Sequence, residues 1–198
     1  MSNKQKLLGN LSYGHTFVVS APAGTGKTTL VGMLVREFDC VKMSISSTTR
    51  APRKHEVDGL HYHFLTEAEF NEGIAKGQFL EHVTLFGYQY GTSLQEIEEI
   101  KKRGNHVVLV IDTQGALQLK GKIPAIFIFL TPPSLEELRD RLVKRGTDTS
   151  IQIEERLSWA RKELSLIKEY DYHIVNANLQ TAYEVLRSII IAEEHKIR

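Results

Sequence analysis

The sequence predicts an α/β fold in which helices cover both faces of a parallel sheet. Short apolar runs alternate with helical stretches along most of the chain, which is the rhythm of strand–helix–strand units. The apolar runs at 107–111 and 125–130 are continuous, as expected of strands that are buried on both faces. A glycine-rich turn joins the first apolar run to the first helical stretch. At 198 residues, the chain fits one compact domain with small insertions.

The first half of the chain contains the start of the sheet and an interruption. An apolar alternation that begins at Val41 predicts a half-buried strand. The expected strands of this half lie at 17–20, 41–47, 61–65 and 79–86, and the expected helices lie at 29–38 and 67–76. A polar, turn-rich stretch at 48–60 breaks the strand–helix rhythm. We therefore interpret residues 44–92 as an inserted, substrate-binding lobe.

The strand–helix rhythm returns from residue 93 onward. The expected strands of this half lie at 106–112, 125–130 and 173–176, and the expected helices lie at 93–102, 134–144, 151–170 and 179–196. The core of a single domain is thus expected to combine residues 14–43, 93–144 and 171–198.

Composition excludes several classes of protein. The formal net charge is +1, so no overall field favours nucleic acid or an acidic membrane, and we expect neither as a partner. The single cysteine, Cys40, excludes an intramolecular disulfide and fits a reducing compartment. No window approaches a membrane span, and the N-terminal residues lack the apolar run of a signal peptide. We expect a cytoplasmic protein, and the choice between monomer and homodimer stays open.

Residues 20–29 read S-A-P-A-G-T-G-K-T-T and describe a phosphate-binding loop between a strand and a helix. The glycines allow backbone N–H groups to turn inward around a phosphate chain, and the following helix directs its N-terminal dipole at the same anion. Lys27 is expected to reach the β and γ phosphates, and the Thr28 hydroxyl is expected to hold Mg²⁺. The residues of this loop that are expected to bind a nucleoside triphosphate are Ala21, Pro22, Ala23, Gly24, Thr25, Gly26, Lys27, Thr28 and Thr29.

Two positions near this loop leave alternatives open. Ala21 stands where a first glycine is usual; it costs about 1 kcal/mol if the position needs a positive φ, and little if it ends a strand. Asp112 ends a buried strand, and in this fold class such an acid lies beside the nucleotide. Whether Asp112 binds the metal directly is a separate question, because a solvated aspartate at a strand end is the ordinary alternative.

The stretch 44–64 reads S-I-S-S-T-T-R-A-P-R-K-H-E-V-D-G-L-H-Y-H-F and carries two arginines around a proline. Arg50 and Arg53 together present bidentate donors that suit a dianionic phosphate. With this stretch the sequence closely resembles the guanylate kinase family, whose pattern S-x-S-S-T-T-R-x-P-R-x-x-E-x-x-G-x-x-Y-x-F is met at every fixed position. Glu81, Y-Q-Y-G-T at 88–92 and I-D-T-Q-G at 111–115 follow in the family's order. The resemblance extends from about residue 17 to residue 192.

The resemblance implies phosphoryl transfer from ATP to GMP, with residues 44–92 as the GMP-binding lobe. Activity toward dGMP stays open. The residues assigned to the GMP phosphate are Arg50, Arg53, Tyr62 and Tyr90, and those assigned to guanine are Ser46, Glu81 and Thr92, with Asp112 nearby. A carboxylate at Glu81 accepts from guanine N1–H and the exocyclic amine together. Adenine has no such pair of donors, which gives a strong basis for rejecting it.

The resemblance also implies a short lid at about 145–156 and an adenine contact. Arg141, Arg145 and Arg156 match the lid pattern, although basic side chains on helices more often form a solvated face. Lid arginines would spread positive charge over the transferred phosphoryl group. With Lys27 and Arg53, the lid residues Arg145 and Arg156 form the expected catalytic set, and Arg141 is assigned to ATP. Asn176 is assigned to ATP as part of V-N-A, where the family has V-N-D.

A second departure from the family pattern concerns magnesium. Val110 stands where many members have an acid, which removes one candidate outer-shell ligand of Mg²⁺.

Two other functions compete with this interpretation. A non-catalytic, protein-binding relative would be expected to lack the intact loop and the lid arginines, and the chain has both. A kinase for another nucleoside monophosphate or for a sugar phosphate is opposed by Ser46, Glu81 and Thr92.

Overall fold

The computed structural model describes residues 6–146 and 148–197, so residue 147 of the expected lid and residue 198 of the expected core lie outside the described residues. Its central sheet has five strands in the order β2-β7-β1-β8-β9, and every neighbouring pair is parallel. The strands are β1 (Thr16–Ser20), β2 (Val41–Met43), β7 (His106–Val110), β8 (Ala125–Thr131) and β9 (Tyr172–Val175). The predicted α/β class and the parallel sheet are confirmed.

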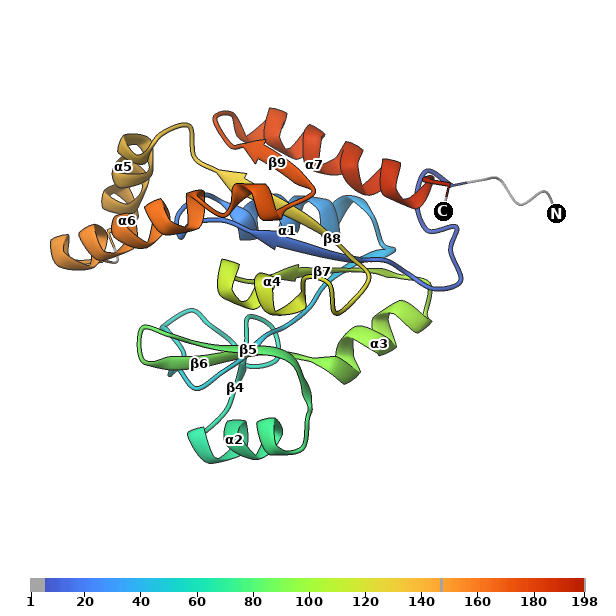
Figure 1. Cartoon of the computed structure of the whole chain (residues 1–198), viewed down its shortest axis with the longest axis horizontal. Helices are drawn as coiled ribbons and strands as arrows, with labels where there is room; N and C mark the ends of the chain where they lie inside the picture. The colour runs from blue at the N-terminus through green and yellow to red at the C-terminus, as the bar shows by residue number, and fades with distance from the viewer. Residues whose placement is uncertain (1–5, 147, 198) are drawn as a thin grey trace.

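Helices cover the two faces of this sheet (Figure 1). On one face lie α1 (Lys27–Glu37) and α7 (Leu179–Glu194); on the other lie α3 (Leu94–Lys102) and α4 (Thr113–Leu119). Along β1, Phe17 and Val19 belong to the apolar cluster under α1 and α7, whereas Val18 belongs to the cluster under α3 and α4. Because successive side chains of a strand point to opposite faces, a sheet with two covered faces requires a continuous apolar run.

A second, smaller sheet lies beside the central one and is antiparallel over most of its length. Its order is β4-β3-β6-β5, formed by β3 (Ser47–Thr48), β4 (His63–Phe64), β5 (Phe79–Leu85) and β6 (Tyr88–Ser93). Helix α2 (Glu67–Ala75) packs against it through Phe70, whose ring stacks on Phe79 at a centroid distance of 4.5 Å. A Cβ at Gly91 would lie 2.9 Å from the Phe79 ring, so only glycine fits under this pair.

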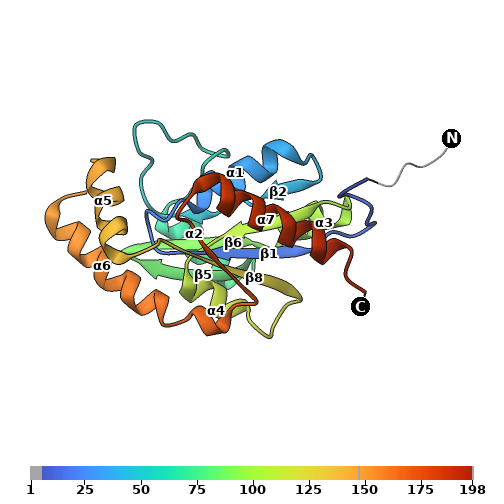
Figure 2. The same cartoon turned by 90° about the horizontal axis from the view of Figure 1, so that it is seen from above.

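The third part of the molecule is a helical hairpin at one end of the central sheet (Figures 1 and 2). It consists of α5 (Leu135–Arg145) and α6 (Ser150–Leu164), and the short 3₁₀ turn η1 (Ile167–Glu169) follows. The two helices share an apolar cluster of their own, built from Leu138, Leu142, Ile153, Leu157 and Ala160. Thr149 caps α6 by a reciprocal arrangement with Gln152, which begins the helix at this position.

Several elements differ from the sequence-based expectation. The strand expected at 41–47 is divided between two sheets, since β2 ends at Met43 and β3 begins at Ser47. The helix expected at 151–170 ends at Leu164. Helix α4 and strand β6 were missed, because α4 contains a glycine and β6 is held by pairing with β5, a contact that local pattern does not reveal. Within the described part of the chain, no helix is long and apolar enough to cross a membrane.

Candidate functional site

The glycine-rich loop connects β1 to α1 and adopts a backbone that only its glycines permit. Gly24 and Gly26 have φ of 91° and 101°. Among the described residues other than glycine, only Phe86 has a positive φ, so Ala21 has an ordinary backbone. Its methyl group is buried in the core under α1. The alternative in which alanine replaces the first glycine at little cost is therefore the correct one.

The loop is supported from outside by the residue after β9 and by α5. The Asn176 amide donates a hydrogen bond of 2.7 Å to the Thr25 carbonyl, and a Cβ at Gly26 would lie 2.8 Å from that amide nitrogen. A Cβ at Gly24 would lie 2.9 Å from Leu142. The close approach of Leu142 and Asn176 leaves little space for a Cβ at Gly24 and Gly26, and the loop is held against the helical hairpin.

Lys27 begins α1 and lies among acidic groups. Its ammonium donates to the Ala21 carbonyl. Burial lowers the pKa of Lys27, while the nearby carboxylates of Glu163 and Asp112 act in the opposite direction. Thr28 and Thr29 are exposed on the first turn of α1. A cation beside exposed hydroxyl and backbone donors is suited to an anionic ligand.

Glu163 was missed in the sequence analysis. It lies near the end of α6, where burial raises its pKa to about 7, opposed by the Lys27 charge and by a hydrogen bond with the Thr113 side chain. Its spacing from Arg156 is seven residues, which places both on the same face of the helix. That spacing was a usable signal, since a helix carrying one functional side chain presents others at positions three, four and seven residues away.

Glu81 and Thr92 pair across β5 and β6 and face the start of α4. The Thr92 hydroxyl donates a 2.6 Å hydrogen bond to Glu81 Oε1, and both side chains are buried. A Cβ at Gly115 would lie 2.6 Å from Glu81 Oε2, so a larger residue here would displace this carboxylate. Burial raises the pKa of Glu81 to about 7, and the negative charge of Asp112 adds to the increase.

Asp112 is the N-cap of α4. Its Oδ1 accepts from the Gly115 N–H at 3.0 Å and its Oδ2 accepts from the Gln114 N–H at 3.3 Å. Burial raises the pKa of Asp112, although these hydrogen bonds oppose the change. The structure thus brings Asp112 near both Lys27 and Glu81, and its contact with the nucleotide stays a prediction.

The predicted phosphate-binding residues of the second sheet gather around Arg50. Its guanidinium lies 5.4 Å from the centroid of the Tyr62 ring, and the Tyr62 and Tyr90 rings are 6.1 Å apart. Arg50 Nη2 donates to Glu56 Oε1 at 2.9 Å, which is the leading cause of the raised pKa of Arg50. Burial raises the pKa of Tyr62, so its phenol remains a donor.

Glu56 is a second residue whose role the sequence analysis missed. Besides Arg50, its carboxylate accepts from the backbone N–H of Arg53 at 2.8 Å. Glu56 therefore holds the loop that carries both arginines. The Arg53 side chain is exposed, and Ser46 is half-buried in the segment between β2 and β3, where its carbonyl accepts from His63 N–H at 2.9 Å. Glu56 belongs to the motif at 44–64, three residues after Arg53, and this spacing was the available signal.

The three predicted lid arginines have different surroundings. Arg141 donates to the Asn176 carbonyl at 3.0 Å and to Glu137 at 3.1 Å, which brings α5 beside the loop-supporting residue. Arg156 donates to Asp148 Oδ1 at 3.2 Å and lies with its guanidinium 5.5 Å from the Phe86 ring. Arg145 is exposed at the last turn of α5. Of the three, Arg145 alone has the surroundings of a solvated side chain.

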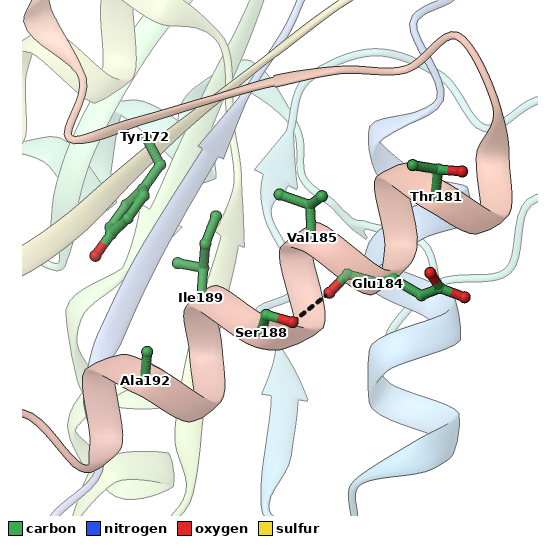
Figure 3. Close-up of a pocket in the computed structure, with 7 residues that line it drawn as sticks. All are labelled: Tyr172, Thr181, Glu184, Val185, Ser188, Ile189 and Ala192. Carbon is green, nitrogen blue, oxygen red and sulfur yellow. Dashed lines mark hydrogen bonds between the residues drawn. The ribbon is translucent and has the colours of Figure 1, made fainter.

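A groove on the outer side of α7 is separate from this site. Figure 3 shows side chains of α7, among them Val185 and Ile189, beside Tyr172 of β9. None of the predicted site residues lines it. The predicted site residues Ala21 and Asp112 instead lie just after the carboxyl ends of β1 and β7, where ligands bind in parallel α/β folds.

Comparison with known proteins relates this geometry to one family. The profile described as guanylate kinase matches residues 13–193. A guanylate kinase of Protochlamydia amoebophila is 56% identical over 184 residues, covering 93% of each chain. One of Chlamydia caviae is 51% identical over 181 residues, covering 91% of this chain and 89% of the relative.

A solved structure agrees with the sequence relatives. The crystal structure of guanylate kinase from Anaplasma phagocytophilum is 33% identical, with a TM-score of 0.77, and the match covers 93% of this chain and 88% of that one. Profile, sequence and fold thus agree over nearly the full length, and the chain belongs to the guanylate kinase family.

Proposed function

We propose that this protein transfers the γ-phosphoryl group of ATP to GMP, giving ADP and GDP. The observation that carries this proposal is the buried Glu81–Thr92 pair, which lies against Gly115 and beside Asp112. A buried carboxylate with an elevated pKa is unfavourable unless a ligand supplies donors, and guanine has two adjacent ones. The same site includes Lys27, so a base-reading group and a phosphate-binding group act on one reaction.

The donor ATP is assigned to the glycine-rich loop. Backbone N–H groups and Lys27 contact the phosphates, and the Lys27 ammonium exchanges the Ala21 carbonyl for a phosphate oxygen. Arg141 and Asn176 lie on the side assigned to adenine, and the Asn176 amide also holds the loop through Thr25. Holding this loop in place before ATP arrives reduces the cost of ordering it in the complex.

Mg²⁺ fits the donor side of this site. The exposed Thr28 hydroxyl offers the hard oxygen ligand that magnesium prefers, and Mg²⁺ usually keeps several waters, so Val110 in place of an acid is tolerated. Thr28, phosphate oxygens and water would hold the ion. When bound, it neutralises charge on the phosphates.

The acceptor GMP is assigned to the second sheet. Arg50, Arg53, Tyr62 and Tyr90 bind its phosphate; the loop that carries both arginines is held by Glu56. Glu81 accepts from guanine N1–H and the exocyclic amine, while Ser46, Thr92 and Asp112 complete the contacts to the base. Because guanine donors favour the ionised carboxylate, binding of GMP lowers the pKa of Glu81 from its value of about 7 in the free protein.

The lid at 145–156 supplies charge during transfer. Lys27, Arg53, Arg145 and Arg156 surround the transferred group and stabilise its equatorial oxygens, while closure of the lid over the GMP-binding lobe at 44–92 excludes water. The reaction requires little covalent chemistry from the protein, so position and charge account for most of the acceleration.

A substrate panel tests the proposal. ADP formation is followed in a coupled assay with ATP, Mg²⁺ and, in turn, GMP, AMP, CMP, UMP and IMP. Turnover that strongly favours GMP is expected. Preference for another nucleoside monophosphate would refute the assignment of Glu81, and no turnover with any acceptor would favour the non-catalytic, protein-binding alternative.

A further inference from the structure

Helix α6 packs against α5 through one face and presents a second set of side chains on another face. Ile153, Leu157 and Ala160 lie on the face buried against α5. The residues Arg156, Trp159 and Glu163 follow a spacing of three and four, so they share a different face. Glu163 on this face is close enough to Lys27 to affect its pKa. On the same face, Trp159 lies about one turn and Arg156 about two turns before Glu163.

The turn between β5 and β6 presents an unusual residue to this face. Phe86 has a φ of 51°, and it is the only non-glycine residue with a positive φ among those described. Its side chain is 51% exposed, so core packing does not explain a bulky ring at this position. Two-residue hairpin turns with positive φ favour asparagine or glycine. A bulky residue with strained backbone persists where the surrounding structure holds it, and such residues cluster at functional sites.

Phe86 makes both of its described aromatic contacts with α6. Its ring lies 6.1 Å from the Trp159 ring at an interplanar angle of 70°, an edge-to-face arrangement. The Arg156 guanidinium lies 5.5 Å from the Phe86 centroid, within the range of cation–π attraction. Arg156 thus lies between Asp148 of the α5–α6 hairpin and Phe86 of the β5–β6 hairpin. In both views the tip of the β5–β6 pair lies at the end of the molecule that carries α6 (Figures 1 and 2).

The same β5–β6 pair connects this turn to the base-reading residues. Its antiparallel register is continuous from the pair Glu81–Thr92 to the pair Leu85–Tyr88, immediately before and after the turn. Uninterrupted backbone pairing joins Glu81 and Thr92 to the turn, so a ligand that restrains these two residues also restrains the position of Phe86. The turn is thus the point at which the acceptor side of the site meets the lid.

We propose that Phe86 is a positioning residue that couples GMP binding to the placement of Arg156. Phe86 contacts Trp159 and Arg156 in the free protein; GMP restrains the β5–β6 hairpin and, through these contacts, holds the lid over ATP. This inference rests on the proposed role of Arg156 in phosphoryl transfer. By linkage, GMP must increase the affinity for ATP, and ATP must increase the affinity for GMP, by the same factor.

The contact can be observed directly, because Trp159 is the only tryptophan of the chain. Its emission reports the surroundings of the Phe86–Trp159 pair without any label. Phe86→Leu removes the aromatic ring, Phe86→Gly removes the ring and the strain of a positive φ, and Phe86→Tyr keeps the ring. Leu and Gly should shift Trp159 emission in the free protein, whereas Tyr should not. An unchanged emission in Phe86→Leu and Phe86→Gly would overturn the proposal.

The coupling is measured by calorimetry with a non-hydrolysable ATP analogue and Mg²⁺. The coupling factor is the Kd of the analogue without GMP divided by its Kd with saturating GMP. It should exceed one in the wild type and fall about threefold to tenfold in Phe86→Leu and Phe86→Gly, as expected for a lost cation–π and aromatic contact. The Kd of each ligand alone should not change. Phe86→Tyr, and Tyr88→Leu as an exposed aromatic of the same hairpin, should keep the wild-type factor.

The possible outcomes separate this inference from the proposed function. A wild-type factor of one, or equal factors in all variants, would refute the coupling. Glycine adopts this positive φ without strain, and an unchanged Kd for each ligand alone shows that Phe86→Gly is folded, so a loss of coupling in it does not reflect unfolding. Arg156→Lys tests the role of Arg156 separately: normal kcat in that variant would refute the catalytic assignment. A low kcat in Arg156→Lys together with an unchanged coupling factor in Phe86→Leu would refute only the role of Phe86.

Discussion

The Thr92 hydroxyl donates a 2.6 Å hydrogen bond to Oε1 of Glu81, and both groups are buried. This bond directs the carboxylate and leaves Oε2 beside Gly115. It also stabilises the ionised form of Glu81, against the burial that raises its pKa to about 7. The pair is therefore a directed acceptor held close to its titration point, and base selection should depend on it.

Glu81→Gln tests base selection through hydrogen-bond direction. The substitution replaces one acceptor oxygen by an NH₂ group, so one of the two guanine contacts becomes donor against donor. We expect kcat/KM for GMP to fall by about 100-fold or more, with a melting temperature close to that of the wild type. IMP lacks the exocyclic amine, so the wild type should use it poorly and the variant should narrow the difference between GMP and IMP. An unchanged GMP-to-IMP ratio of kcat/KM would show that Glu81 does not read the base.

The titration of Glu81 predicts a pH dependence. Below pH of about 7 the free carboxyl is protonated and loses part of its acceptor capacity, so KM for GMP should rise as pH falls from 8 to 6. The GMP phosphate titrates in the same range, but it does so equally with either protein. The wild type should therefore show a steeper rise than Glu81→Gln. Parallel profiles of KM against pH would contradict this assignment.

Lys27→Ala tests the glycine-rich loop. The ammonium is proposed to contact the donor phosphates alone, so kcat should fall by about 100-fold or more while the Kd for GMP is retained. Steady-state kinetics with ATP and calorimetry with GMP measure the two quantities. Near-normal kcat would remove this loop from the catalytic site.

Arg50→Ala and Arg53→Ala test binding of the acceptor phosphate. Loss of a charge-assisted hydrogen bond removes about 1.5–3 kcal/mol, so each variant should raise KM for GMP by roughly tenfold to 100-fold. Arg50 is packed on Tyr62 and bonded to Glu56, so its loss should also disturb its neighbours and have the larger effect. Calorimetry with GMP provides an independent measure. Unchanged affinity in both variants would mean that this loop is only a solvated basic surface.

Glu194→Gln tests a buried polar cluster far from the site. Burial opposes ionisation of Glu194, but hydrogen bonds from Gly9, Asn10 and His106 lower its pKa to about 2. Burial also opposes the charged form of His106, and for a histidine this lowers the pKa. The Glu194 pKa is depressed in the folded state, so its stabilisation, on the order of 3 kcal/mol, is present above about pH 4.5 and lost as pH falls toward 2.

His106 acts in the same direction, because a depressed histidine pKa makes protonation below pH of about 6.5 unfavourable in the folded state. The free energy of unfolding from urea titrations should therefore decrease steadily on acidification of the wild type. Glu194→Gln should be less stable at pH 7 and show a weaker dependence below pH 5. Equal slopes for the two proteins would contradict this account.

Local sequence patterns predicted some elements of this fold and missed others. The continuous apolar run of β7 and the glycine-rich loop after β1 predicted the sheet and the triphosphate site, because burial on two faces and positive φ both leave direct marks in the sequence. Helix α4 left no such mark, since a seven-residue segment with an internal glycine depends on the Asp112 cap and on packing. The division of 41–47 between two sheets is likewise a matter of pairing partners.

The sequence by itself determined the fold class, the phosphate-binding loop and the residue types that suit GMP. Only the tertiary structure decided which residues meet. Glu81 lies against Gly115, and Glu163 lies near Lys27. Glu56 accepts a hydrogen bond from Arg50, and Phe86 contacts α6. Propensity and periodicity depend on neighbours within a few residues, whereas these contacts join segments far apart in the chain. Their energies depend on burial and on distance in space, and neither quantity exists until the chain has folded.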